Sequence, residues 1–171
     1  MQQAWGWGLG LLVLLNRLVP ADEVEWGQWV LLLAWGGFIG NFVLSLTDHA
    51  QNGFFYSTEW VPVGVAAFVV GWLALPIFRP TPPRYLWLAG LVLIVAAVTG
   101  LAGFVFHVAP VIGEDAGTLS ERIIYGAPIF APLLFPNLAL LGLLGVWDLQ
   151  AKGHVARVPP EVADERAGVT D

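Results

Sequence analysis

The chain contains no cysteine among its 171 residues, and charged side chains make up only 12% of it. Without cysteine there are no disulfides, no thiolate metal sites and no thiolate-bound iron–sulfur clusters. Cysteine usage therefore does not indicate whether the protein lies in an oxidising or a reducing compartment. Basic residues number seven and the net charge is −6. Because a nucleic-acid partner requires a basic face, we expect no nucleic-acid binding.

The residues that are abundant are apolar ones. Hydrophobic side chains reach 57%, the mean hydropathy is +0.73, and nine residues are tryptophan. A soluble domain of this length is typically about 45–50% apolar and about 25% charged. Tryptophan is enriched where a membrane meets water. The composition therefore predicts a multi-pass integral protein of the cell membrane, in contact with the lipid bilayer.

Five apolar runs divide the chain. Each is about as long as the ~20 residues that a helix needs to cross a bilayer. They predict an all-α bundle within residues 1–150, with five transmembrane helices, or four if the short first run does not span. The runs are 5–19, 26–46, 61–78, 85–108 and 123–147.

Two details qualify the ends of this pattern. The first run could instead be a signal peptide, but no basic residue precedes it, which favours a membrane helix. Residues 151–171 are polar and contain Pro159 and Pro160, so we expect a disordered tail.

In the fifth run Pro128, Pro132 and Pro136 recur every four residues, and we expect them to bend that helix.

The basic residues predict the orientation. Arg79 and Arg84 lie between the third and fourth runs, and Lys152, Arg157 and Arg166 follow the fifth. These two segments lie on one side because two crossings separate them. Since cytoplasmic loops are rich in Lys and Arg, that side is predicted to be cytoplasmic. The N-terminus is then outside and the tail inside.

The stretch from Asn41 to Trp60 is the longest interruption of the apolar sequence and is predicted to be an outer hairpin. Asn41, Ser45 and Asp48 recur at i, i+4 and i+7, so they share one face of a helix. A polar stripe in hydrocarbon is costly unless it faces the bundle interior. We therefore expect the face with Asn41, Ser45 and Asp48 to point inward, with Asn137 of the fifth run as a second buried polar group and a candidate partner.

Histidine and carboxylate residues are predicted to converge at the outer ends of the helices. His49 and His107 fall at similar depths on different helices, and Asp48 and Glu59 lie beside them. One interpretation is a cofactor site in which the two imidazoles bind haem iron or a transition metal, with Asp48 and Glu59 as oxygen ligands. The alternative is a pair of interfacial histidines, solvated or hydrogen-bonded to a loop carboxylate.

Aromatic residues follow the same hairpin. Tyr56 and Trp60 could form a wall for a haem edge, a quinone or a lipid, and with Asn41 they complete the predicted cofactor contacts. The membrane-interface aromatic belt explains them equally well without a ligand.

Three functions fit these patterns. The first is a redox or cofactor-binding membrane subunit. The second, which we favour because it accommodates such a site without requiring one, is a subunit of a larger membrane complex. Its helices carry glycines that permit close helix packing, such as Gly36, Gly40 and Gly100. The third is a membrane enzyme acting on a lipid or isoprenoid at the outer leaflet, with His49 or Asp48 as acid or base.

Overall fold

A computed structural model describes residues 26–113 and 117–151. This part of the chain is helical, with no strand. Its elements, in chain order, are α2 (Trp26–Gln51), the 3₁₀ turn η1 (Ser57–Glu59), α3 (Trp60–Phe78), α4 (Pro83–Gly113), the short α5 (Leu119–Tyr125), the 3₁₀ turn η2 (Ala131–Leu133) and α6 (Leu134–Ala151).

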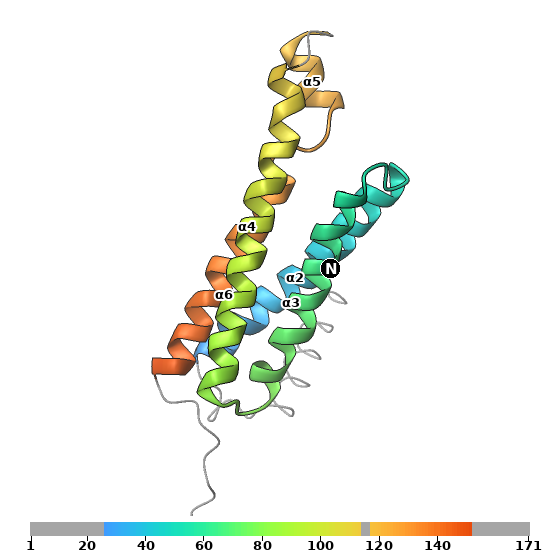
Figure 1. Cartoon of the computed structure of the whole chain (residues 1–171). Helices are drawn as coiled ribbons and strands as arrows, with labels where there is room; N and C mark the ends of the chain where they lie inside the picture. Colours follow the sequence, from blue (N-terminus) through green and yellow to red (C-terminus); the bar gives the residue numbers. More distant parts are fainter. Residues whose placement is uncertain (1–25, 114–116, 152–171) are drawn as a thin grey trace, which may run out of the picture.

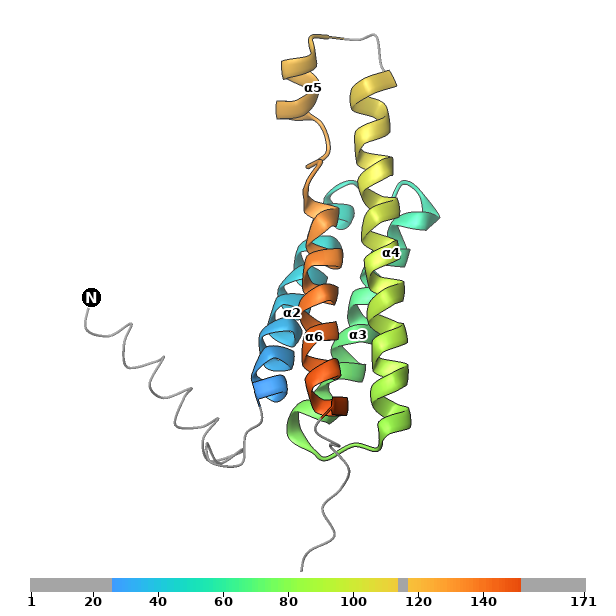
Figure 2. The ribbon, with the colours of Figure 1, turned by 90° about the vertical axis from the view of Figure 1, so that its left-hand side faces the viewer.

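The four long helices form a bundle in which α2 packs against α3 and α6, and α4 packs against the same two helices (Figures 1 and 2). We call the end where residues 79–82 join α3 to α4 the loop end. The opposite end, where residues 52–59 join α2 to α3, is the hairpin end. The helix α5 lies beside the last turns of α4, past the hairpin end (Figure 1).

The four long helices are long and apolar enough to cross a membrane. Much of their surface is correspondingly apolar and exposed, as with Leu33, Phe68 and Leu91 on three different helices. The prediction of an all-α bundle with membrane-length helices is confirmed. The predicted first helix, 5–19, and the predicted tail lie outside the described residues.

Helices α2 and α4 extend beyond the predicted spans. The helix α2 continues to Gln51 instead of ending at Leu46, which places Asp48 and His49 in its last turns. The helix α4 runs from Pro83 to Gly113 instead of from 85 to 108. In both cases the predicted ends mark where the apolar sequence stops. The helix itself continues, because its backbone hydrogen bonds do not depend on apolar side chains.

The predicted fifth span, 123–147, differs most from the structure. It is not one bent helix, because α5 ends at Tyr125 and α6 begins at Leu134. Between them, Pro128 and Pro132 have no N–H to donate to a preceding turn, so the chain leaves the helical path. Pro136 falls in the first turn of α6, where a missing N–H is tolerated.

Glycines set the closest helix contacts. A Cβ atom on Gly27 would lie 2.8 Å from the carbonyl oxygen of Gly145, and a Cβ atom on Gly145 would lie 2.8 Å from that of Gly27. At position 100 a Cβ atom would lie 2.5 Å from the Cβ atom of Phe135. Small residues let two backbones approach this closely, so α6 is seated against both α2 and α4.

Polar side chains fix the loop end by satisfying free helix termini. The backbone N–H of Gly27, in the first turn of α2, donates to Oδ2 of Asp148 on α6 at 3.0 Å. A carboxylate is favourable there because the first N–H groups of a helix have no intrahelical acceptor. At the end of α3, the side-chain amide of Gln28 donates to the carbonyl of Ile77 at 3.3 Å.

A proline inside α3 explains one interhelical hydrogen bond. Pro76 cannot donate to the carbonyl of Trp72, four residues earlier. That carbonyl instead accepts from the hydroxyl of Tyr85 on α4, at 2.8 Å, and the rings of Trp72 and Tyr85 stack with centroids 5.0 Å apart. The carbonyl that Pro76 leaves without a donor within α3 thus forms a hydrogen bond between α3 and α4.

Replacing Tyr85 by phenylalanine is expected to lower the free energy of unfolding by about 1 kcal/mol, because the carbonyl of Trp72 loses its donor. Thermal unfolding in detergent measures the loss, and Tyr125→Phe, at an exposed position, is the control. In a Pro76→Ala background the new N–H of residue 76 can serve the same carbonyl. An unchanged effect of Tyr85→Phe in that background would refute this explanation.

Candidate functional site

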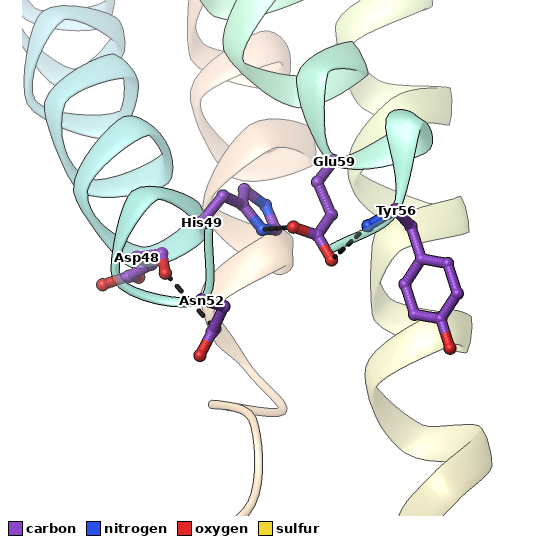
Figure 3. Close-up of polar contacts among 5 residues, drawn as sticks. All are labelled: Asp48, His49, Asn52, Tyr56 and Glu59. Carbon is purple, nitrogen blue, oxygen red and sulfur yellow. Dashed lines mark hydrogen bonds and ion pairs between the residues drawn. The ribbon is translucent and has the colours of Figure 1, made fainter. Parts of the chain in front are cut away.

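The hairpin end brings together the side chains of two of the predicted site residues. The Nδ1 atom of His49, in the last turn of α2, lies 3.5 Å from Oε2 of Glu59, at the end of η1 (Figure 3). Each side chain is about one-fifth exposed, at 20% and 18%. The second carboxylate oxygen accepts from the backbone N–H of Tyr56 at 3.4 Å. Glu59 is thus held by the turn and in turn orients the imidazole.

The turn between α2 and α3 brings these residues together. Gly53 and Phe54 both have positive φ, at 69° and 51°. Phenylalanine rarely adopts this conformation, which costs roughly 1–2 kcal/mol. Its ring stacks on that of Trp60, with centroids 3.8 Å apart and planes 7° from parallel. This contact offsets the strain and folds the turn back over the start of α3.

Other predicted residues of the hairpin do not face the ion pair. Asp48 is exposed, so the prediction that it points inward with Asn41 is wrong, and its side chain points away from His49 (Figure 3). Its backbone carbonyl accepts from the side chain of Asn52 at 3.3 Å. The ring of Tyr56 is exposed and lies edge-on to Phe55. Trp60 is engaged with Phe54, so these aromatic rings contact one another.

His107 makes a separate contact. Its Nδ1 atom lies 3.0 Å from the carbonyl oxygen of Pro128, in the segment between α5 and η2. A carbonyl can only accept, so Nδ1 carries the proton and Nε2 is the unprotonated nitrogen of the neutral ring. The contact ties this segment back to α4, supported by Phe130 near Phe104, with ring centroids 6.4 Å apart.

The predicted four-residue metal site does not form within one chain. Among the described residues, no group of three or more His, Cys, Asp or Glu side chains is arranged to hold a metal ion. His49 and Glu59 lie together, His107 contacts Pro128, and Asp48 points outward. Hydrophobicity placed these residues at one depth, but depth alone did not determine which side chains meet.

Asn41 is buried, as predicted, with 5% of its surface exposed. Its Nδ2 atom has no hydrogen-bond partner in the described part of the chain. The expected partner Asn137 is on the surface of α6, so that prediction is wrong. The buried face of α6 contains Phe135, Ala139 and Gly142, and Asn137 lies on the opposite face. An unpaired buried amide donor costs roughly 1–3 kcal/mol and favours an acceptor supplied from elsewhere.

A second feature of the hairpin end is an apolar projection that we call the arm. It comprises α4 from Phe104 to Gly113, α5, and residues 126–130. Figure 1 shows it rising past the turn between α2 and α3. Most of its large apolar side chains are exposed, and these are Val105 61%, Phe106 68%, Ile112 76%, Leu119 57%, Ile123 50%, Ile124 68%, Tyr125 84% and Phe130 72%, whereas Val111 is buried.

Helix lengths show how far the arm extends. With a rise of 1.5 Å per residue, Asp48, the first charged residue of α2, lies about 33 Å from Trp26. On α4 the exposed Ile112 lies about 44 Å from Pro83. Both helices start at the loop end. Exposed apolar side chains on the arm therefore lie up to about 10 Å farther from the loop end than Asp48, the first charged residue of α2.

The start of α5 is well defined despite its exposure. Thr118 caps it, with its side-chain oxygen accepting from the backbone N–H of Glu121. The carboxylate of Glu121 accepts from the backbone N–H of Thr118 at 2.8 Å and from its hydroxyl at 3.0 Å. The backbone hydrogen bond is the larger cause, and the two together lower the pKa of the Glu121 carboxyl below its ordinary value. The cap is thus fully formed at neutral pH and weakens only in acid, as pH falls through that lowered pKa.

Three features of this end were not predicted from the sequence. They are the stack of Phe54 on Trp60, the Pro128 carbonyl as partner of His107, and the arm. The pair Asn52-Gly53 signals a turn, and Gly126 with Pro128 signals a helix break, so the first two had local indications. The arm had none, since its residues are as apolar as a membrane span.

The described fold defines a class, an all-helical bundle whose four long helices fit a bilayer. Comparisons of the chain with family models, with curated proteins and with solved structures gave no match in any of the three. The function must accordingly be argued from the site and the surface.

Proposed function

We propose that this protein is a subunit of a larger complex in the cell membrane and that the arm is where it docks. In this proposal the loop end, with Arg79 and Arg84, faces the cytoplasm. The hairpin end and the arm lie on the opposite side. The partner is a protein chain that covers the apolar arm near the membrane surface.

The observation that carries this proposal is the exposed apolar surface of the arm at its distance from the loop end. The hydrocarbon core of a bilayer is about 30 Å thick. If α2 and α4 cross it together, Ile112 and α5 lie beyond the lipid tails. Apolar patches exposed to water are typical of protein interfaces, and Tyr125, 84% exposed, is a residue type enriched in them.

The mass of the assembly in gently extracted membranes tests the proposal. One chain has a mass of 18.5 kDa. We expect the purified particle, measured by sedimentation under detergent-matched conditions, to exceed one copy and to contain a second kind of chain in fixed ratio. A particle with a single copy, or with copies of this chain alone, would contradict the proposal.

A second candidate function, the binding of a haem or metal cofactor, is favoured by the orientation of the two histidines. His49 directs Nδ1 at a carboxylate, and His107 directs Nδ1 at a backbone carbonyl. Histidines that bind metals commonly use the ring nitrogen opposite the metal in this way. Neither Nε2 atom has a hydrogen bond among the described residues. The unpaired amide of Asn41 is a further donor that a bound group could satisfy.

Absorption spectroscopy and metal analysis of the purified complex test this candidate. A bound haem gives a Soret band, and we expect it to be lost in His49→Ala or in His107→Ala, whichever imidazole binds the iron, while the particle mass is unchanged. Asp48→Ala is the matched control, since that side chain points away from His49. Wild-type complex with neither a Soret band nor a stoichiometric metal would eliminate the cofactor function. Nε2 of His49 would then remain as the acid or base of the membrane-enzyme alternative.

A further inference from the structure

One side of α2 has no partner among the described residues. Its exposed positions lie opposite the face that packs on α6 and α3, and a row of them on one helix face is Trp29, Leu33, Gly36, Gly40 and Val43. We call this the open face of α2. Nothing lies within 4 Å of a Cβ atom built on Gly36 or on Gly40.

Gly36 and Gly40, like Gly64 and Gly71 of α3, differ from the glycines that lie at helix contacts. At Gly27, Gly37 and Gly100 a Cβ atom would meet another helix within 3 Å, so those glycines are used for close packing. Glycine in a helix interior costs about 1 kcal/mol relative to alanine. Lipid chains gain little from a notch of two glycines, whereas a second helix can approach closely at such a notch.

A segment of this chain has the length, chemistry and tether to fill the open face. Residues 5–19 are apolar except for Asn16 and Arg17 near their C-terminal end, and they contain a second glycine pair with the same spacing, Gly6 and Gly10. Six residues, 20–25, join this segment to Trp26 at the start of α2. A link this short fits two antiparallel helices packed side by side, 8–10 Å apart.

The glycine pairs would also meet at the same depth. Along α2, Gly36 and Gly40 lie about 15 and about 21 Å from Trp26. In a helix ending at Val19, Gly10 and Gly6 would lie about 14 and about 20 Å from that end. An antiparallel arrangement thus sets Gly10 opposite Gly36 and Gly6 opposite Gly40, to within about 2 Å.

We propose that residues 5–19 form a helix that packs antiparallel on the open face of α2, with the two glycine pairs in contact. This helix adds a fifth member to the bundle and covers α2 on the side away from α6. The proposal is independent of the arm and of the proposed function, so either can fail without the other.

Disulfide trapping in native membranes tests it, because the chain has no cysteine of its own. Val13 is on the same helical face as Gly6 and Gly10, about 9 Å from Val19, and Leu33 is on the open face, about 11 Å from Trp26. With mild oxidant, the double variant Val13→Cys with Leu33→Cys should form an intrachain disulfide. The disulfide is detected when neither thiol reacts with a maleimide any longer while the protein keeps the mass of a monomer. The control pairs Val13→Cys with Leu88→Cys, an exposed position at similar depth on α4. We expect at least about tenfold less disulfide in the control, because its thiols lack a high effective concentration.

Each other outcome overturns the proposal. Disulfide-linked dimers of Leu33→Cys alone would assign the open face to a second copy. Equally low disulfide yields in both pairs would mean that residues 5–19 do not pack on the open face. The face would then be covered by lipid or by another partner, or the segment would have been removed. Thermal unfolding of each variant, compared with the cysteine-free chain, checks that the bundle is intact.

Discussion

Replacing Gly100 by leucine is expected to abolish recovery of folded protein. A Cβ atom at this position would lie 2.5 Å from the Cβ atom of Phe135, 2.5 Å from Cδ of Pro136 and 2.6 Å from the carbonyl oxygen of Pro132. These atoms belong to the backbone or lie next to it, so no change of side-chain rotamer can relieve the overlap. Leucine would have to separate α4 from α6, with an expected loss of at least about 3 kcal/mol.

The matched control for this prediction is Gly64→Leu. Gly64 is on the exposed side of α3, and nothing lies within 4 Å of a Cβ atom built there. The same change of residue should leave the melting temperature within a few degrees of wild type or raise it, since leucine has the higher helix propensity. Size-exclusion yield and thermal unfolding in detergent give the comparison. Equal behaviour of the two variants would show that α4 and α6 do not pack as closely as described.

The substitution Ile124→Asn is expected to separate the protein from its complex while leaving the bundle folded. Ile124 is 68% exposed on α5, so its side chain contributes little to the stability of the isolated chain. In the proposed interface it is a central apolar contact. Loss of such a contact costs about 2 kcal/mol or more, which corresponds to roughly thirtyfold weaker binding.

The measurement is the fraction of chain that sediments with its partner as detergent extract is diluted. Ser120→Asn, an exposed polar position on the same helix, is the control and should bind like wild type. Retention of the complex by Ile124→Asn would place the interface elsewhere. Loss of folded Ile124→Asn would instead mean that α5 is packed against the bundle more tightly than its exposure indicates.

Apolar run length was sufficient to predict the class of the fold. The runs 26–46, 61–78 and 85–108 correspond to α2, α3 and α4, because a membrane helix must satisfy its backbone within one segment. Apolar run length was insufficient where an apolar stretch cannot form the hydrogen bonds of a continuous helix. Residues 123–133 are apolar, yet Pro128 and Pro132 prevent a continuous helix from forming there.

The candidate site was predictable only in part. The contact of His49 with Glu59 follows from two residues ten positions apart on either side of a turn, so local sequence brought them together. His107 depended on where the chain goes after α5, and hydrophobicity does not report that path. Asn137 was assigned to the interior because it is a polar residue within an apolar run. With α6 starting at Leu134, Asn137 faces outward.

Photo-crosslinking in intact membranes tests the central claim, that the arm is covered by a partner protein. A photoreactive amino acid at position 124 is compared with one at Leu91, which is 54% exposed in the third turn of α4. We predict a discrete protein adduct of higher mass from position 124 and only lipid adducts from position 91. Lipid adducts alone from position 124 would contradict the account, because the arm would then lie in the bilayer.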